Sequence, residues 1–518
     1  MQLTPEQEKA LALIRQKQFV LIHGVTGSGK TEIYLRAAQE VCAAGRQVIV
    51  LVPEISLTPQ TVQRFAERFK IAALHSALTP KQRRESWQKI LNGEVQLAVG
   101  ARSALFAPFQ NLGLIIIDEE QDSSYKQDNN PRYHAVTAAL QRAEFCGAKT
   151  LLGTATPALE TYHLFQNPPD DRYGYIYLPR RVKDRPLPPV EIVDMRAELQ
   201  NGNFSVLSAR LQKELRACLD SGGKAMLLMN RRGFATFVSC RACGYTLECP
   251  RCSVALVYHS DGQAKCHYCG RAEKIPEEQR CPSCGRPYLK YFGAGTQKAE
   301  AELRKYFGDA HILRMDSDTT AKRGAHEKIL KEFLAADRAV LLGTQMIAKG
   351  HDFSAVTLVG IIAADALLNL PDFRSAEQTF QLLTQAAGRA GRGDQAGRVI
   401  VQTYQPEHYA VQAAARHDAP GFYARELATR RELNYPPFSR LTAIVFAAAD
   451  EARAKKMAEH YARKYAPQAL GPAPCIIRKL KGYYRWQILL KDTEINYADF
   501  PAEASVKIEI DVDPLNMY

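Results

Sequence analysis

A glycine-rich stretch over residues 24–31 constrains this chain more than any other feature. It reads GVTGSGKT, follows the apolar run of residues 19–22, and precedes a helical pattern over residues 32–44. This is the spacing of a phosphate-binding loop, in which backbone N–H groups and the positive end of the next helix face an anion. The flanking strand and helix favour this interpretation over an ordinary glycine turn. The expected nucleotide-binding residues are Gly24, Thr26, Gly27, Ser28, Gly29, Lys30 and Thr31.

Individual roles follow from the chemistry of such loops. Lys30 is expected to reach the β- and γ-phosphates, and the Thr31 hydroxyl to hold Mg²⁺. Asp118 and Glu119 come directly after the apolar run of residues 114–117, where burial is costly unless they hold a cation or activate water. We therefore predict that Asp118 binds Mg²⁺ and that Glu119 orients the attacking water. Gln7, in the first turn of a helix that Thr4 caps, either reads the adenine edge or is solvated.

Length and charge limit the classes of function. At 518 residues the chain is long enough for three or four domains, and a formal net charge of +13 favours a polyanionic partner. The first thirty residues lack the apolar core of a signal peptide, and no run of eighteen apolar residues occurs. We therefore expect a cytoplasmic protein without a membrane partner.

A second strand–helix series begins after the proline-rich residues 179–189, which are typical of a linker. This series has no phosphate loop. Its last helix ends in the sequence QAAGRAGR over residues 385–392, with Arg389 and Arg392 three residues apart. Such a pair usually lies on a solvated helix face. The glycines beside it favour a catalytic role instead, because an arginine that reaches a γ-phosphate stabilises transition-state charge.

Cysteine pairs interrupt the second series. Four Cys-x-x-Cys knuckles lie between residues 240 and 284, which indicates two closed tetrahedral zinc sites rather than disulfides. Residues 254–265 read as a β-hairpin, which would bring the second knuckle onto the third and leave the first to join the fourth. The predicted ligand sets are Cys240, Cys243, Cys281 and Cys284 for one zinc, and Cys249, Cys252, Cys266 and Cys269 for the other.

Two stretches combine aromatic and basic residues, which favours contact with nucleic acid through stacking and phosphate neutralisation. One is the polar loop after the acidic residues, and the other is a strand pattern near the carboxyl end. Partly buried tyrosines in a surface loop, or tyrosines in a sheet core, are the alternatives. The candidate DNA-binding residues are Tyr125, Lys126, Arg132 and Tyr133 in the loop, and Lys479, Lys481, Tyr484, Arg485 and Trp486 near the end.

The motifs taken together resemble a superfamily 2 helicase, and more specifically the PriA family of bacterial replication restart. The helicase motifs are DEEQ at 118–121, GTAT at 153–156 and the arginine helix; LVPEISLT at 51–58, GTQMIAKGHDF at 343–353 and the cysteines are typical of PriA. The resemblance covers essentially the whole chain. It implies that Asp352 contacts the nucleotide, that residues 125–134 form an aromatic-rich coupling loop, and that the last hundred residues bind DNA.

The resemblance also implies an activity and partners. It predicts a DNA-stimulated, ATP-dependent 3′→5′ DNA helicase that uses ATP, Mg²⁺ and two Zn²⁺, binds stalled or branched forks and single-stranded DNA, and initiates primosome assembly. The implied partners are single-stranded-DNA-binding protein, primosome proteins and the loader of the replicative helicase, and the implied location is the bacterial nucleoid. Two alternatives are a translocase or fork-remodelling ATPase that moves on duplex DNA without strand separation, and a zinc scaffold with a decayed nucleotide site.

The sequence departs from the family pattern in two respects. The usual amino-terminal DNA-binding region is missing, which indicates a trimmed sequence or a short member and puts recognition of fork ends in doubt. Gln121 stands where many members have histidine, which is expected to alter how hydrolysis is coupled to DNA contact but to leave the metal and the base unaffected.

The predicted fold class is α/β, with two RecA-like doubly wound lobes, a Cys-rich zinc-binding insertion in the second lobe and a small α+β domain at the end. The predicted boundaries are 1–178 for the ATP-binding lobe, 179–237 and 291–418 for the two parts of the second lobe, 238–290 for the insertion, and 419–518 for the carboxyl-terminal DNA-binding domain.

Overall fold

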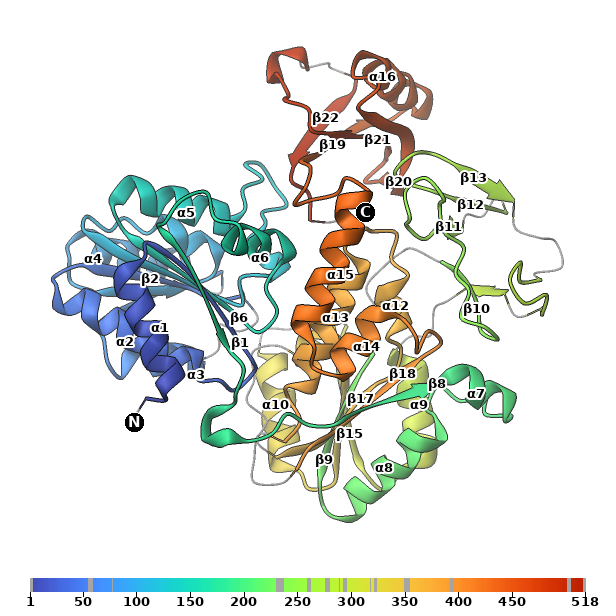
Figure 1. Cartoon of the computed structure of the whole chain (residues 1–518), viewed down its shortest axis with the longest axis horizontal. Coiled ribbons are helices and arrows are strands. Elements are labelled where there is room, and N and C mark those ends of the chain that lie inside the picture. Colours follow the sequence, from blue (N-terminus) through green and yellow to red (C-terminus); the bar gives the residue numbers. More distant parts are fainter. Residues whose placement is uncertain are drawn as a thin grey trace. The chain divides into compact units, whose positions relative to one another are not determined.

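The computed structural model describes most of the chain and divides it into two compact units (Figure 1). The first comprises residues 1–188, 346–354 and 384–397, and the second comprises residues 189–345, 355–383 and 398–518. The residues that the structure describes are 3–54, 59–76, 78–229, 237–258, 262–274, 280–287, 289–291, 296–316, 318–320, 324–348, 355–391, 396–500 and 505–515.

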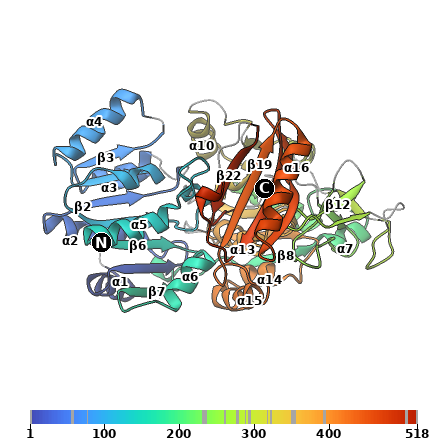
Figure 2. The same cartoon turned by 90° about the horizontal axis from the view of Figure 1, so that it is seen from above.

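The first unit is built on a parallel sheet with the strand order β3-β4-β2-β5-β6-β1-β7. Strands β3 and β7 lie at its opposite ends, as Figure 2 shows. The strands are β1 (Phe19–Gly24), β2 (Gln47–Leu51), β3 (Ile71–Leu74), β4 (Leu97–Gly100), β5 (Leu112–Asp118), β6 (Lys149–Thr154) and β7 (Tyr173–Leu178). The helices are α1 (Pro5–Gln16), α2 (Lys30–Ala43), α3 (Pro59–Ala66), α4 (Pro80–Leu91), η2 (Arg102–Phe106), η3 (Ser123–Tyr125), α5 (Ala135–Cys146), α6 (Leu159–Gln166) and η4 (Val182–Asp184).

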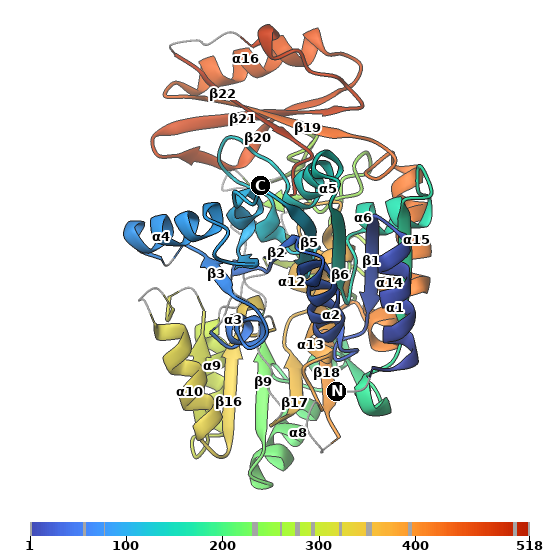
Figure 3. The ribbon, with the colours of Figure 1, turned by 90° about the vertical axis from the view of Figure 1, so that its left-hand side faces the viewer.

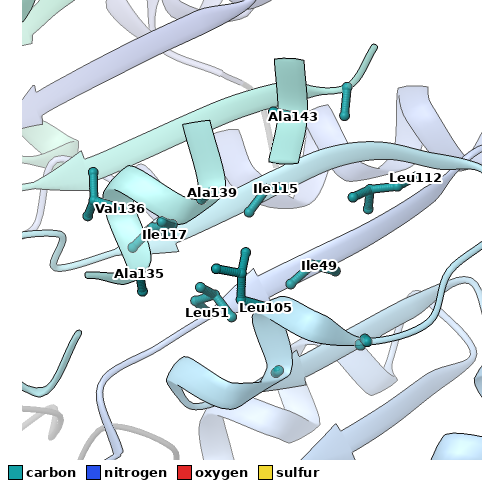
Figure 4. Packing of buried hydrophobic residues seen from close by; sticks show 14 of the residues in the cluster. Ile49, Leu51, Leu105, Leu112, Ile115, Ile117, Ala135, Val136, Ala139 and Ala143 are labelled. Atoms are coloured by element: carbon teal, nitrogen blue, oxygen red, sulfur yellow. The ribbon is translucent and has the colours of Figure 1, made fainter. Parts of the chain in front are cut away.

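Central strands β2 and β5 are buried on both faces, as their continuous apolar runs predict. Side chains alternate between the faces because successive residues of a strand point in opposite directions. Ile49 and Ile115 belong to the cluster that packs with α5 on one face, where Figure 4 shows Ile115 beside Ala139. Their neighbours Val48 and Leu114 pack with α1 and α2 on the other. Both faces of the sheet are therefore covered, and its carboxyl edge is left to carry polar groups.

The second unit contains another parallel sheet, with the order β15-β16-β9-β17-β18-β8. Leucines of α8 and the apolar side of α9 cover one face of it. Its strands are β8 (Val190–Asp194), β9 (Lys224–Leu228), β15 (His311–Met315), β16 (Ala339–Gly343), β17 (Val356–Ile361) and β18 (Arg398–Thr403). The helices of this part of the chain are α7 (Met195–Gln200), α8 (Ala209–Asp220), α9 (Thr296–Tyr306), α10 (Ala325–Ala335), α11 (Gln345–Ala348), α12 (Asp365–Leu368), α13 (Ser375–Ala387), α14 (Tyr409–Ala415) and α15 (Ala419–Glu432).

Two smaller modules belong to the second unit. The cysteine-rich insertion contains the antiparallel pair β10 (Val238–Cys240) and β14 (Leu289–Tyr291), and the antiparallel ribbon β11 (Val257–Tyr258), β12 (Gln263–Lys265) and β13 (Ala272–Lys274). The pairing of β11 with β12 confirms the predicted hairpin.

The module at the carboxyl end is an antiparallel sheet with the order β20-β21-β19-β22. Helix α16 covers one face of it, as Figure 3 shows. Its elements are β19 (Leu441–Ala448), α16 (Glu451–Lys464), β20 (Ala469–Leu480), β21 (Tyr483–Lys491), η5 (Tyr497–Asp499) and β22 (Lys507–Val512). These strands and the two parallel sheets confirm the predicted fold class.

Candidate nucleotide and zinc sites

The phosphate loop connects β1 to α2 and has the backbone that phosphate binding requires. Gly27 and Gly29 have φ values of +87° and +81°, which favour glycine, and Gly29 is the residue before the first turn of α2. The Lys30 Nζ donates to the Gly24 carbonyl at 2.7 Å, within its own loop. The buried Ser28 Oγ has no hydrogen-bond partner among the described residues. An orphaned, buried hydroxyl in a loop with this backbone fits a bound phosphate.

Asp118 ends β5 and Glu119 follows it, at the carboxyl edge of the same sheet, where β5 lies between β2 and β6. Tyr34 on α2 donates its hydroxyl to Asp118 Oδ1 at 2.9 Å. Burial, and then the charge of Glu119, raise the pKa of Asp118 to about 6, while Lys30 and the Tyr34 hydrogen bond oppose the rise. Ionising a carboxylate here is costly without a cation, so this donor fits the predicted Mg²⁺.

Gln121 links the acidic residues to the next strand. Its Nε2 donates to Glu119 Oε2 at 2.8 Å, and its Oε1 accepts from the Thr154 hydroxyl at the end of β6. Glu119 itself has a φ of +50°, which is uncommon for a residue with a side chain and is often found at functional sites. Gln121 therefore holds the predicted base by a hydrogen bond from an uncharged amide and ties it to the GTAT motif.

A cavity of about 270 Å³ lies next to the loop, between the start of α1 and the segment after β7. Gln7 lines this cavity, is 4% exposed, and is hydrogen-bonded both to the start of α1 and to the phosphate loop. Its Oε1 accepts from the Thr4 N–H at 2.9 Å, and its Nε2 donates to the Ser28 carbonyl at 3.2 Å. The amide keeps one N–H and one lone pair for another partner, which is what recognition of an adenine edge needs.

The arginine segment after α13 belongs to the same compact unit as the phosphate loop. Gly388 lies so close to Thr26 that a Cβ on this glycine would be 2.5 Å from the Thr26 Oγ1. Arg389 is 9% exposed, and its Nε donates to the Ala348 carbonyl at 2.7 Å. Arg392 and Asp352, which were also predicted to serve the nucleotide, lie outside the described residues.

The cysteines of the insertion gather in the two predicted sets. Within each set the sulfur atoms lie within 4.8 Å of one another. The sulfurs of Cys240 and Cys284 are 3.7 Å apart, as are those of Cys249 and Cys269. A tetrahedron with Zn–S bonds of about 2.3 Å has edges of about 3.8 Å, whereas a disulfide needs about 2.05 Å. Both sets therefore fit a closed, structural zinc site.

Comparison with known families separates this chain from helicases in general. The model of the DEAD/DEAH box helicase matches residues 4–165, and that of the helicase conserved C-terminal domain matches residues 291–394. Two further models are specific: the PriA DNA helicase Cys-rich region domain matches residues 249–274, and the primosomal protein N C-terminal domain matches residues 431–515.

Curated relatives agree over the whole chain. The replication restart protein PriA of Bacillus subtilis (strain 168) is 46% identical, over 99% of this chain and 67% of its own length. The chain belongs to the PriA family. The Synechocystis relative is also 46% identical, over 100% of this chain and 65% of the relative, and that of Treponema pallidum is 42% identical, over 99% and 80%. The chain thus spans about two thirds of the first two relatives.

The PriA family consists of ATP-dependent DNA helicases, and the matched models account for the two lobes, the insertion and the last module. Among solved structures, RecG bound to a three-way DNA junction aligns with a TM-score of 0.48 and 17% identity, over 84% of this chain and 50% of that chain. No helix in the described part of this PriA-family chain is long and apolar enough to cross a membrane.

One prediction for the DNA-contacting loop needs correction. Tyr125 is fully buried in the core of the first sheet, and its hydroxyl donates to the Asp118 carbonyl at 2.7 Å. Its ring offers no face to a base, so Tyr125 supports the acidic strand end instead. Lys126 is 6% exposed, whereas Arg132 and Tyr133 are half-buried. The surface-loop interpretation with buried tyrosines therefore fits Tyr125, and Arg132 and Tyr133 remain candidates.

The candidates near the carboxyl end differ in burial and in their contacts. Trp486 packs toward α16, and its Nε1 donates to Glu451 at 3.3 Å. Lys479 and Lys481 are exposed, and the Lys479 Nζ lies 4.5 Å from the centre of the half-buried Tyr484 ring. Arg485 is half-buried. The exposed lysine candidates of this strand pair therefore lie at the β20–β21 turn, and Trp486 is half-buried against α16.

Sequence reasoning missed two residues of the nucleotide site. Tyr34 has no motif of its own, although a Cβ on Gly153 would lie 1.7 Å from its hydroxyl oxygen, so the glycine of the GTAT motif makes room for it. Arg181 lies in the stretch interpreted as a linker, yet it is 6% exposed. A buried arginine in a linker is unusual, but only the structure reveals the burial.

Proposed function

We propose that this PriA-family chain is a DNA-stimulated, ATP-dependent 3′→5′ DNA helicase that acts on stalled or branched replication forks and initiates primosome assembly. The main support is that a phosphate loop, a half-buried acidic pair and the GTAT motif converge at one sheet edge. There Gln121 bridges Glu119 to Thr154. A decayed site would have no reason to keep this hydrogen-bonded constellation.

Each group has a defined task in hydrolysis. Lys30 and the loop amides hold the phosphates, and Gln7 faces the base. Thr31 and Asp118 would hold Mg²⁺, which when bound neutralises phosphate charge. Glu119 accepts a proton from the attacking water and orients it, and Arg389 stabilises the charge that develops on the γ-phosphate. Gln121 can couple a change in the position or protonation of Glu119 to Thr154, because its amide is hydrogen-bonded to both side chains.

The experiment that tests this assignment is Lys30→Ala in the full chain. Removal of the ammonium should lower DNA-stimulated ATP hydrolysis by about 10²-fold or more, while DNA binding by fluorescence anisotropy stays within about twofold. The matched control is Lys89→Ala, an exposed lysine of α4, which packs against the edge strand β3 rather than against β1. Undiminished turnover by Lys30→Ala would refute the assigned site.

Substrate and partners are tested separately. A directional strand-displacement assay on forked DNA, with and without single-stranded-DNA-binding protein, distinguishes a helicase from a translocase on duplex DNA. Pull-down with primosome proteins and the helicase loader tests the assembly role, and cell fractionation tests a nucleoid location in the bacterial cytoplasm. Strand separation with the opposite polarity would overturn the proposed direction. Two Zn²⁺ per chain, held by the two cysteine sets, are expected to supply structural stability only.

A further inference from the structure

Arg181 follows the last strand of the first sheet and is buried in the first unit. Its exposed fraction is 6%. A guanidinium rarely sits so deep without several acceptors, because burial removes the hydration of a permanent charge. The hydrogen-bond partners of the guanidinium therefore indicate the role of Arg181.

The guanidinium contacts the backbone on both sides of Arg389. Its Nη2 donates to the Gly388 carbonyl at 3.2 Å, and its Nη1 donates to the Gly391 carbonyl at 3.3 Å. All these residues belong to the same compact unit. A planar fork with two donating nitrogens fixes both carbonyls at once, which a single ammonium cannot do in the same geometry.

The rest of the residue is held against the phosphate loop. The Val182 N–H donates to the Gly27 carbonyl at 2.9 Å, and a Cβ on Gly27 would meet the Arg181 stem at 3.5 Å. Arg181 also lines the cavity beside Gln7. One side chain therefore connects the cavity wall, the glycine loop and the backbone that carries Arg389.

We propose that Arg181 is a positioning residue for hydrolysis: it holds the backbone around Arg389 at the phosphate loop. This rests on the proposed function, because Arg389 has a task only if ATP is hydrolysed here. The residue acts through Arg389 and does not itself touch the reacting phosphate. Arginine contributes to transition-state stabilisation only when it is placed correctly, so loosening its backbone should lower kcat more than ATP binding.

The test compares Arg181→Lys, Arg181→Ala, Arg389→Ala and the double variant Arg181→Ala/Arg389→Ala in the full chain with DNA and ATP. Arg181→Ala should lower kcat by about 10²-fold with KM for ATP changed less than about threefold, and Arg181→Lys should recover only part of the loss. The double variant should be no slower than Arg389→Ala within about twofold, because both changes remove one contribution. The control is Arg15→Ala, whose exposed ion pair with Glu40 is at the surface of the same unit.

The outcomes separate the two levels of inference. If the unmodified chain shows no DNA-stimulated ATP hydrolysis, the proposed function fails first. If that activity is present, either of two results refutes the positioning role. One is that Arg181→Lys keeps full kcat. The other is that the kcat of the double variant falls below that of Arg389→Ala by as large a factor as Arg181→Ala alone causes. Thermal melting of each variant is measured alongside, and Arg181→Lys decides the matter if Arg181→Ala is unfolded.

Discussion

The two cysteine sets have the same ligands but different surroundings. The inner set, Cys249, Cys252, Cys266 and Cys269, lies in an apolar cluster with residues of the carboxyl-terminal module, including Tyr435, Leu441 and Leu489. The outer set, Cys240, Cys243, Cys281 and Cys284, has a small cluster of its own, and Cys284 is exposed. Two zinc sites with the same four-cysteine ligand set can therefore stabilise different parts of the molecule, because different residues pack around them.

Hydrogen bonds strengthen the contrast. The Tyr435 hydroxyl donates to the Cys252 carbonyl at 3.1 Å, and the Gln487 side-chain amide donates to the His267 carbonyl at 2.8 Å. The Phe373 N–H, just before α13, contacts the Tyr268 hydroxyl at 3.3 Å. The inner set therefore lies in a contact region, called the joint below, where the insertion, the second lobe and the last sheet pack together. Figure 1 shows β20 beside this ribbon.

The largest effect is expected from Cys266→Ser. Loss of one thiolate removes metal binding worth on the order of 10 kcal/mol and loosens the joint, so amides of β20 and β21 should exchange with solvent at least about tenfold faster. Hydrogen exchange with mass spectrometry measures this, and elemental analysis should fall from two zinc ions per chain to one. Unchanged exchange in the last sheet would show that the inner metal is not part of the joint.

A smaller and more local effect is expected from Cys284→Ser. It should also remove one zinc, but its ligand is exposed and its set contacts little of the last sheet, so faster exchange should be confined to residues 237–291. The comparison with Cys266→Ser is direct, since each changes one sulfur to oxygen. If both variants destabilise the last sheet equally, the distinction between the sets is wrong.

The smallest effect is expected from Tyr435→Phe. It deletes the hydroxyl that donates to the Cys252 carbonyl and keeps the ring that stacks on Phe373 at 4.6 Å, so unfolding should become easier by about 1 kcal/mol. Urea unfolding measures this, with zinc content unchanged. Tyr497→Phe, at a ring that is 65% exposed, is the control. A loss as large as that of Cys266→Ser would mean that the hydroxyl itself maintains the metal site.

Local sequence was sufficient for the parts of this molecule whose chemistry is local. The phosphate loop, the strand that delivers Asp118 and the knuckle pairing were all predictable, because spacing and alternation fix them within a few dozen residues. The sequence-based prediction was wrong for Tyr125. This residue lies in an aromatic and basic stretch of the kind that stacks on bases, but its ring is buried and its hydroxyl donates to the Asp118 carbonyl. Whether an aromatic ring faces solvent depends on what packs against it, and that is not encoded nearby.

From the sequence alone, the family, the fold class, the glycine loop and the pairing of the cysteine knuckles could be predicted, because these depend on residue types at short, fixed separations. The folded chain was needed to show that Arg181 contacts the backbone on both sides of Arg389, about two hundred residues later, and that the inner cysteine set packs against the last sheet. Such contacts join distant parts of the chain, and burial and hydrogen-bond geometry select them only once the whole unit has folded.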